Sequence, residues 1–257
     1  MKMPDRQTKK EARRDFLRPN RYALDMDPIL RDGKTHPVAL ILPGGGYAMV
    51  CSFIEGRPLA RRLNEMGVSA VIVYYRLRGR ARFPAPVEDV ARAVRELTAR
   101  ADELNIDMEH YSLWGASAGA HAAALFAAES CGWTRYGVKK PSALVLSYPV
   151  ISMEEGLSHA GSRRNLLGKA PAAEQVRAAS ADQQVTGSYP PTFLWCGDAD
   201  KLVSAENSRR MDDALSRNNV PHEFHLYPHV EHGVGLGIGT ACEGWEKQAV
   251  RFWEERV

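Results

Sequence analysis

The stretch Tyr111–His121, Tyr-Ser-Leu-Trp-Gly-Ala-Ser-Ala-Gly-Ala-His, decides the fold. A short apolar run ends at Gly115, Ser117 and Gly119 follow at alternate positions, and an Ala-rich run comes next. This Gly-x-Ser-x-Gly pattern is typical of a sharp strand-to-helix turn with a strained serine at its tip, because a Cβ two residues to either side would collide with the neighbouring strand or helix. It predicts a hydroxyl held above a sheet, with a helix N-terminus behind it. An ordinary Gly/Ala-rich turn into a core helix fits the motif alone, so the partner residues decide.

Length and composition set the broad class. At 257 residues, with 44% hydrophobic and 25% charged residues, the chain is typical of a globular protein with one well-buried core. A net charge of +3 without a basic stripe argues against nucleic acid. We find no apolar run of membrane-spanning length and no signal-peptide pattern, and four scattered cysteines lack metal-ligand spacing. We therefore expect a cytoplasmic protein without a membrane or nucleic-acid partner, and both monomer and homo-oligomer stay open.

Apolar runs of strand length alternate with helical patterns along the whole chain. This alternation predicts an α/β fold with a mostly parallel central sheet and helices on both faces. We expect an N-terminal arm at 1–20 and a single domain at 21–257. The predicted strands are Pro37–Leu42, Val68–Tyr75, Tyr111–Trp114, Ala143–Tyr148, Pro190–Gly197 and Glu223–Tyr227, and the predicted helices are Glu55–Met66, Pro86–Leu104, Ala116–Ser130, Ser204–Asn218 and Gly244–Glu255.

Residues 150–190 differ from the rest of the chain. They are rich in Gly, Ser and Ala and carry only short helical patches. A weakly patterned insertion of this length inside a compact domain is usually a functional cap or disordered. We expect a small cap-like insertion here.

The glycine-rich segment Pro43-Gly44-Gly45-Gly46-Tyr47 follows a predicted buried strand. A flexible turn and a phosphate-binding loop are two interpretations, but no Gly-Lys-Ser/Thr follows, which disfavours the second. Backbone N–H groups of such a loop at a strand's C-terminal end can instead form an oxyanion hole. Pro43 then stands where the His-Gly-Gly-Gly loops of lipases and esterases have histidine. The expected donors are Gly45 or Gly46 together with Ala118.

A serine nucleophile needs a base, and the base needs an orienting acid, in the chain order Ser, Asp/Glu, His. His229 and His232 both lie in the loop after the strand at 223–227, where a base must sit, whereas His222 and His225 flank the strand. We favour His232, because the glycines of His-Gly-Val-Gly-Leu-Gly let the backbone place its ring. His229 is the alternative, and surface histidines without a role would be the plainer explanation.

Two aspartates follow the strand at 190–197, in Gly197-Asp198-Ala199-Asp200. A turn rich in Asp and Gly is the plain structural explanation for both. The residue three after the glycine, with a valine three further on, is the usual position of the acid, which favours Asp200. Asp198 is the fallback and would more naturally stabilise the turn.

Together these motifs resemble the α/β-hydrolase superfamily, and more narrowly its carbohydrate acetyl-esterase (acetyl xylan esterase-like) group, near the hormone-sensitive-lipase and feruloyl-esterase-like families. The similarity covers roughly residues 35–255, and Pro43 fits the acetyl-esterase group better than the lipases. The resemblance implies a serine esterase that removes short acyl groups, acetyl in the first place, from small or carbohydrate esters. The motifs that carry it are PGGGY at 43–47, Glu55-Gly-x-Pro-Leu-Ala, Tyr74-Tyr-Arg-Leu, Pro86-x-x-Asp89, Gly115–His121 and Ser147-Tyr-Pro-Val.

The residues imply acyl transfer through a Ser117–His232–Asp200 triad and an acyl-enzyme, without a metal or an organic cofactor. Glu55 could hydrogen-bond near the site, but a helix N-terminal carboxylate is the plainer interpretation. The arginines at 76, 78, 80 and 82 could contact a polar substrate or simply form an exposed basic loop. For His121 we expect capping or packing within the helix.

Two other functions compete. A serine peptidase of the prolyl-oligopeptidase type or an arylformamidase would share the triad, and only the pocket and the 150–190 insertion would distinguish them. A catalytically idle hydrolase fold that binds a ligand or partner is the other alternative. The intact Ser117, Asp200 and His232 argue against it.

Overall fold

The computed structural model describes residues 20–257, and the arm expected at 1–20 lies almost entirely outside the described residues. Seven strands form one sheet in the order β1-β3-β2-β4-β5-β6-β7. All neighbours pair in parallel except β1, which runs antiparallel to β3 at one edge. The strands are β1 Ala23–Asp25, β2 His36–Leu42, β3 Ser69–Tyr74, β4 Ile106–Ala116, β5 Ala143–Ser147, β6 Thr192–Gly197 and β7 His222–Tyr227.

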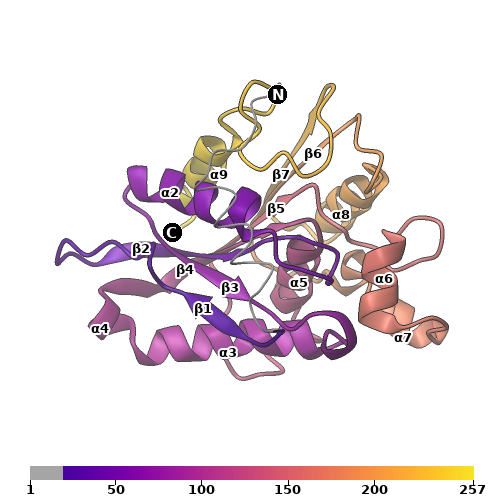
Figure 1. The fold of residues 1–257 in the computed structure, drawn as a ribbon, viewed down its shortest axis with the longest axis horizontal. Coiled ribbons are helices and arrows are strands. Elements are labelled where there is room, and N and C mark those ends of the chain that lie inside the picture. Colours follow the sequence, from indigo (N-terminus) through magenta and orange to yellow (C-terminus); the bar gives the residue numbers. More distant parts are fainter. Residues whose placement is uncertain (1–19) are drawn as a thin grey trace.

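Helices cover both faces of this sheet, which confirms the predicted α/β-hydrolase fold (Figure 1). Helix α2 packs beside α9 on one side, and α3 packs beside α5 on the other. Helix α5 is buried along its whole length, so its Ala- and Gly-rich sequence has no polar face and allows close packing against the strands. The main helices are α2 Arg57–Glu65, α3 Ala85–Ala99, α4 Ala101–Leu104, α5 Ser117–Ala127, α8 Glu206–Arg217 and α9 Trp245–Glu254.

Several elements differ from their predicted bounds; the helix expected at 86–104, for example, is divided at Arg100 into α3 and α4. Strand β4 begins at Ile106, five residues before the predicted start at Tyr111, because His36 and Pro37 at the start of β2 pair with Ile106 and Asp107. The polar residues of this extension hide it from a hydrophobic pattern. The helix expected at 55–66 is preceded by a π-helical turn, Ser52–Gly56, and becomes α-helical at Arg57.

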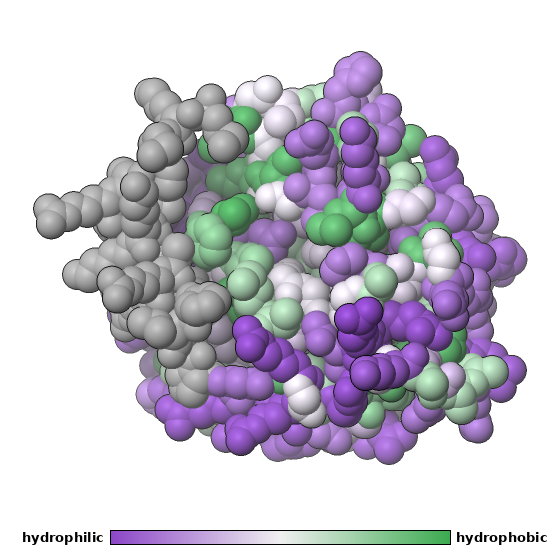
Figure 2. Space-filling view, turned by 45° about the vertical axis from the view of Figure 1, so that its right-hand side comes forward, coloured by the Kyte–Doolittle hydropathy of each residue, from purple (hydrophilic) through white to green (hydrophobic). Residues whose placement is uncertain are grey.

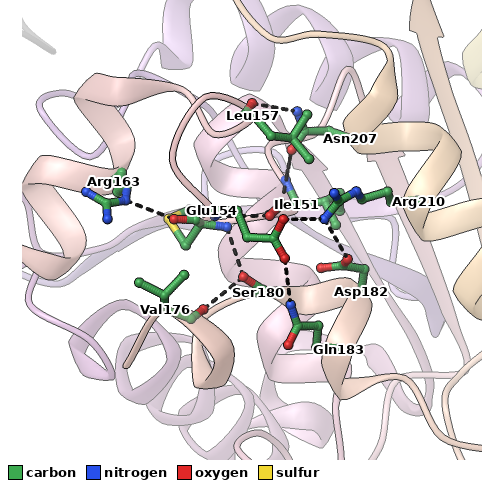
Figure 3. A network of polar contacts seen from close by, with 12 residues as sticks. Ile151, Glu154, Leu157, Arg163, Val176, Ser180, Asp182, Gln183, Asn207 and Arg210 are labelled. Carbon is green, nitrogen blue, oxygen red and sulfur yellow. Dashed lines mark hydrogen bonds and ion pairs between the residues drawn. The ribbon is translucent and has the colours of Figure 1, made fainter. Parts of the chain in front are cut away.

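The 150–190 segment forms helices α6 (Ala160–Leu167) and α7 (Ala173–Ala178) and a 3-10 turn at 181–184, and it lies between β5 and β6 in sequence (Figure 1). We call it the cap. Side chains of α8 hold it in place (Figure 3). Asn207 accepts the amides of Ile151 and Ser152 at 3.0 and 3.1 Å and donates to the Leu157 carbonyl. Arg210 forms an ion pair with Glu154, with 2.7 Å between Nη1 and Oε2.

No helix within residues 20–257 combines the length and the apolar character needed to cross a lipid bilayer. All four cysteines are free thiols, and Cys196 is buried within β6.

Candidate active site

Ser117 lies at the junction of β4 and α5 and adopts a left-handed backbone conformation, with φ of 50°. The flanking glycines are required by close contacts. A Cβ at Gly115 would collide with the Ala120 backbone, and one at Gly119 would collide with the carbonyl oxygen of Leu42. The strand, the turn and the helix therefore approach one another closely enough to fix the serine in a strained conformation.

The structure brings Ser117, His232 and Asp200 together. Nε2 of His232 lies 2.9 Å from Oγ of Ser117, and Nδ1 lies 2.6 Å from Oδ2 of Asp200. Since a carboxylate can only accept, Nδ1 carries the ring proton and Nε2 accepts from the serine hydroxyl. The Asp200 side chain is 1% exposed and that of His232 is 12% exposed, so this chain of hydrogen bonds is largely shielded from water.

Asp198 and Asp200 hold different partners. Oδ1 of Asp200 accepts the amides of Leu202 and Val203 at 2.9 Å each, which fixes the carboxylate and leaves Oδ2 for His232. Asp198 instead accepts the amide of His229 at 2.6 Å and so ties its own turn to the histidine loop. The geometry places Asp200 beside the ring of His232 and gives Asp198 and His229 a contact within the loops.

The glycine-rich loop 43–47 lies beside Ser117. Its carbonyl groups are occupied: the Gly44 carbonyl accepts the Cys51 amide, the Gly45 carbonyl accepts the Ala48 amide, and the Gly46 carbonyl accepts the Asn165 side chain. The amides of Gly45 and Gly46 have no hydrogen-bond partner among residues 20–257. Ala118 lies in the first turn of α5, where backbone N–H groups lack intrahelical acceptors. These three amides are candidate oxyanion donors near the serine.

Glu55 has a buried carboxylate, with 7% of the residue exposed. Oε2 accepts the Gly44 amide at 2.6 Å, and Oε1 accepts the Tyr148 hydroxyl at 3.0 Å. Burial raises the pKa of Glu55, while the two hydrogen bonds and the nearby His232 act in the opposite direction. The sequence indicates a carboxylate at a helix start, and the structure shows one directed into the protein.

His121 lies four residues after the serine and is completely buried. Its Nε2 donates to the carbonyl of Ala179 at 2.7 Å, so its Nδ1 accepts from the hydroxyl of Tyr47, also at 2.7 Å. Burial lowers the pKa of His121 from 6.5 to about 4. The side chain thus joins α5 to the glycine-rich loop and to the cap, which goes beyond packing within its own helix.

The cap reaches the glycine-rich loop through α6. Asn165 donates to the Gly46 carbonyl at 2.8 Å, and the ring of His159 lies 3.3 Å from the position a Cβ on Gly46 would take. Nδ1 of His159 accepts from Ser162, which leaves Nε2–H as a donor without a partner in the described part of the chain. Burial and the nearby His232 lower the pKa of His159.

The other polar residues singled out in the sequence have structural partners. Arg76 binds Asp89 and Glu88, and Arg82 donates to the carbonyls at the end of α6. His222 contacts Asp212, and His225 lies 3.4 Å from Glu223. Among residues 20–257, no group of three or more His, Cys, Asp or Glu side chains is arranged to hold a metal ion.

Figure 2 turns the cap side of the molecule forward and shows apolar residues gathered among hydrophilic ones. Met49 and Ile54, which follow the glycine-rich loop, are 39% and 40% exposed. Ile54 also contacts the histidine loop, since a Cβ at Gly235 would lie 2.8 Å from its carbonyl oxygen. The surroundings of the serine are therefore partly apolar and partly lined by donors from the cap.

Comparison with known proteins adds independent findings. A model of the BD-FAE family matches residues 26–215. Endo-1,4-beta-xylanase B of Butyrivibrio fibrisolvens is 32% identical over 91% of this chain, and acetylxylan esterase of Xylanibacter ruminicola is 32% identical over 76%. The chain spans 37% and 40% of the length of these two relatives.

Among solved structures, the acetyl ester-xyloside bifunctional hydrolase from Caldicellulosiruptor lactoaceticus is similar to this chain with a TM-score of 0.80. It is 35% identical, and the match covers 88% of this chain and 85% of that one. The likeness therefore extends over nearly the whole of both chains.

Proposed function

Because this chain belongs to the BD-FAE family, we propose that it is a serine carboxylic-ester hydrolase that removes short acyl groups, acetyl above all, from carbohydrate or other small esters. The observation that carries the proposal is the hydrogen-bonded series Ser117–His232–Asp200 beside the glycine-rich loop, where the Gly45 and Gly46 amides have no partner within residues 20–257. A nucleophile, a base with an orienting acid, and oxyanion donors are the groups that acyl transfer requires.

The mechanism follows from this geometry. His232 Nε2 takes the proton of Ser117 Oγ as the oxygen attacks the ester carbonyl, and Asp200 stabilises the imidazolium that forms. The amides of Gly45 or Gly46 and of Ala118 would stabilise the oxyanion, each of them contributing about 2.7–4 kcal/mol by analogy with other oxyanion holes. The protonated His232 then gives its proton to the leaving alcohol. Water hydrolyses the acyl-enzyme by the same steps.

A small acyl group is supported by the names of two similar proteins, an acetylxylan esterase and an acetyl ester-xyloside bifunctional hydrolase. A cavity of about 10 Å³ borders Ala116, the residue before Ser117, and Tyr148, Trp114 and Trp245 form part of its wall. A cavity of this volume accommodates about one water-sized group. Ser117 itself does not line this cavity, so the proposed acetyl preference rests on the relatives.

A carbohydrate alcohol is supported by the relatives and by the cap. The names of two similar proteins contain acetylxylan esterase and acetyl ester-xyloside hydrolase. In this chain the cap brings the Nε2–H of His159, which has no partner among the described residues 20–257, next to the glycine-rich loop. A donor at this place suits a hydroxyl-rich leaving group, because a sugar offers many acceptors.

The test is acetate release from acetylated xylo-oligosaccharides and hydrolysis of p-nitrophenyl acetate, by the wild type and by Ser117→Ala. We expect the wild type to act on both and the variant to lose at least about 10⁴-fold in kcat on each. Hydrolysis of p-nitrophenyl acetate without acetate release from the oligosaccharides would support the triad and refute the carbohydrate substrate. Cleavage of aminoacyl anilides or N-formyl arylamines in preference to esters would favour the peptidase or the arylformamidase. Equal rates in both proteins would refute the role of Ser117.

A further inference from the structure

The carboxylate of Glu55 is connected to two loops that the proposed reaction needs. It contacts the glycine-rich loop directly, through the Gly44 amide at 2.6 Å, and it is connected to the histidine loop through Tyr148. The Tyr148 hydroxyl donates to Glu55 and itself accepts the amide of Gly235, in the histidine loop, at 3.3 Å. A single buried side chain therefore stands between the two halves of the site.

The Gly44 contact removes one amide of the glycine-rich loop from the possible oxyanion donors. Because the Gly44 N–H points to Glu55, it is unavailable as an oxyanion donor, and the next amides along the chain, of Gly45 and Gly46, are left unpaired among residues 20–257. A hydrogen bond to an ionised carboxylate is about twice as strong as a neutral one. Glu55 thereby fixes the start of a turn in which Gly45 and Gly46 have φ of 126° and 61°.

Tyr148 also contacts His232, the proposed base. The Tyr148 ring packs edge-on against His232, with centroids 4.9 Å apart, and against Trp195 at 5.0 Å. Tyr148 follows β5 and has φ of 36°, a strained conformation for a bulky residue that packing and hydrogen bonds must hold. The interaction of Glu55 with His232 is electrostatic as well, so an ionised Glu55 favours positive charge on the imidazole.

We propose that Glu55 is a positioning residue of the proposed esterase, and that it couples the oxyanion loop to the catalytic histidine through Gly44 on one side and Tyr148 on the other. The inference rests on the proposed function. Loss of Glu55 should disturb interactions made in the transition state much more than substrate binding, because its partners hold the oxyanion donors and the base. The measured effect should lie in kcat.

The experiment compares Glu55→Ala, Glu55→Gln and Tyr148→Phe with the wild type on p-nitrophenyl acetate, per active site counted with a fluorophosphonate. We expect kcat to fall about 100-fold in Glu55→Ala, the size of effect of one lost oxyanion donor, with KM changed less than about 3-fold. The amide of Glu55→Gln still accepts from Gly44 but leaves the Tyr148 hydroxyl without an acceptor. We expect that variant and Tyr148→Phe to lose about 10-fold each.

Glu246→Gln is the matched control, because Glu246 in α9 is also a buried glutamate, and it pairs with Arg62 of α2 at 3.3 Å without contacting Gly44, Tyr148 or the catalytic residues. We expect its kcat per site to stay within about 2-fold of the wild type even if its melting temperature falls. The double variant Glu55→Ala/Tyr148→Phe should be no slower than Glu55→Ala by more than about 3-fold, since both act through one connection.

Three results would overturn the inference: an unchanged kcat per site in Glu55→Ala, a loss equal to that of Glu246→Gln, or fully multiplicative effects of the two changes. If Glu55→Ala does not fold, Glu55→Gln and Tyr148→Phe give the same decision. A wild type without ester hydrolysis would instead refute the proposed function, so the two failures are distinguishable.

Discussion

Tyr47 donates a hydrogen bond to Nδ1 of His121 across 2.7 Å, and so joins the glycine-rich loop to the helix that begins at Ser117. The contact requires a neutral imidazole, because Nε2 already donates to Ala179 and a second ring proton would face the Tyr47 hydroxyl. Two segments 74 residues apart in sequence are thereby held by one titratable group.

Lowering the pH should reduce the free energy of unfolding, because His121 is buried in its neutral form. Its pKa is about 4 in the folded protein and 6.5 in the unfolded chain, so between these values the unfolded state binds more protons. The contribution to the free energy of unfolding is complete above pH 6.5 and is lost as the pH falls towards 4. It amounts to about 3 kcal/mol, at 1.36 kcal/mol per pKa unit.

Urea unfolding of the wild type and His121→Gln at pH 7.5 and 4.5 measures this effect. The variant should be less stable at pH 7.5, and its deficit should shrink by about 2 to 3 kcal/mol at pH 4.5. Other groups that titrate in this range affect both proteins, so they cancel in the difference between the wild type and the variant. A deficit independent of pH would show that His121 titrates normally.

The two aspartates of the 198–200 turn should differ sharply in kinetics. Asp200→Asn leaves the amide contacts of that turn but disturbs the proton on His232, and we expect kcat to fall about 10³–10⁴-fold. Asp198→Asn keeps an acceptor for the His229 amide and should stay within about 10-fold of the wild type. Steady-state kinetics on p-nitrophenyl acetate decide between them, and a reversed order would move the acid to Asp198.

The proposed acetyl preference predicts hydrolysis rates that fall as the acyl chain lengthens. A series of p-nitrophenyl esters from acetate to butyrate should lose about 100-fold in kcat/KM over its two added methylenes, since each mismatched methylene is worth about 10-fold. Rates that rise with chain length would contradict the proposed acetyl preference. Hydrolysis by Ser117→Ala provides the background to subtract.

His159→Ala should slow the hydrolysis of carbohydrate esters more than the hydrolysis of a simple acetate ester. Its Nε2–H has no partner within residues 20–257 and lies beside the glycine-rich loop. Losing one hydrogen bond to a sugar should lower kcat/KM on acetylated xylo-oligosaccharides about 5- to 10-fold. The rate on p-nitrophenyl acetate should change less than about 2-fold, and an equal loss on both substrates would deny a role in recognising the alcohol.

Local patterns carried the prediction of the sheet and of the elbow. The glycines at 115 and 119 are required by contacts between adjacent elements, so their spacing could be recognised in the sequence. The choice of Asp200 over Asp198 likewise rested on spacing, and the structure places Asp200 against His232. These features depend on short-range spacing and on the order of elements along the chain, both of which can be read from the sequence.

Contacts between distant segments were beyond the sequence. Glu55 meets Tyr148 from 93 residues away, and nothing in either neighbourhood indicates the other. The buried carboxylate acceptor and the hydroxyl donor come together only in the folded protein, once the strands of the sheet have paired. The polar start of β4 was missed for a related reason, because its pairing with β2, and not its hydrophobicity, makes it a strand.

The hydrogen bond from Asn165 to the Gly46 carbonyl has a consequence for protein engineering. Exchanging the 150–190 segment for that of a relative is an obvious way to change substrate preference, and it treats the segment as an interchangeable module. Here the module also supports the turn that presents the Gly45 and Gly46 amides. A chimaera should therefore keep an amide side chain at the position of Asn165, or its altered selectivity will come with a slower chemical step.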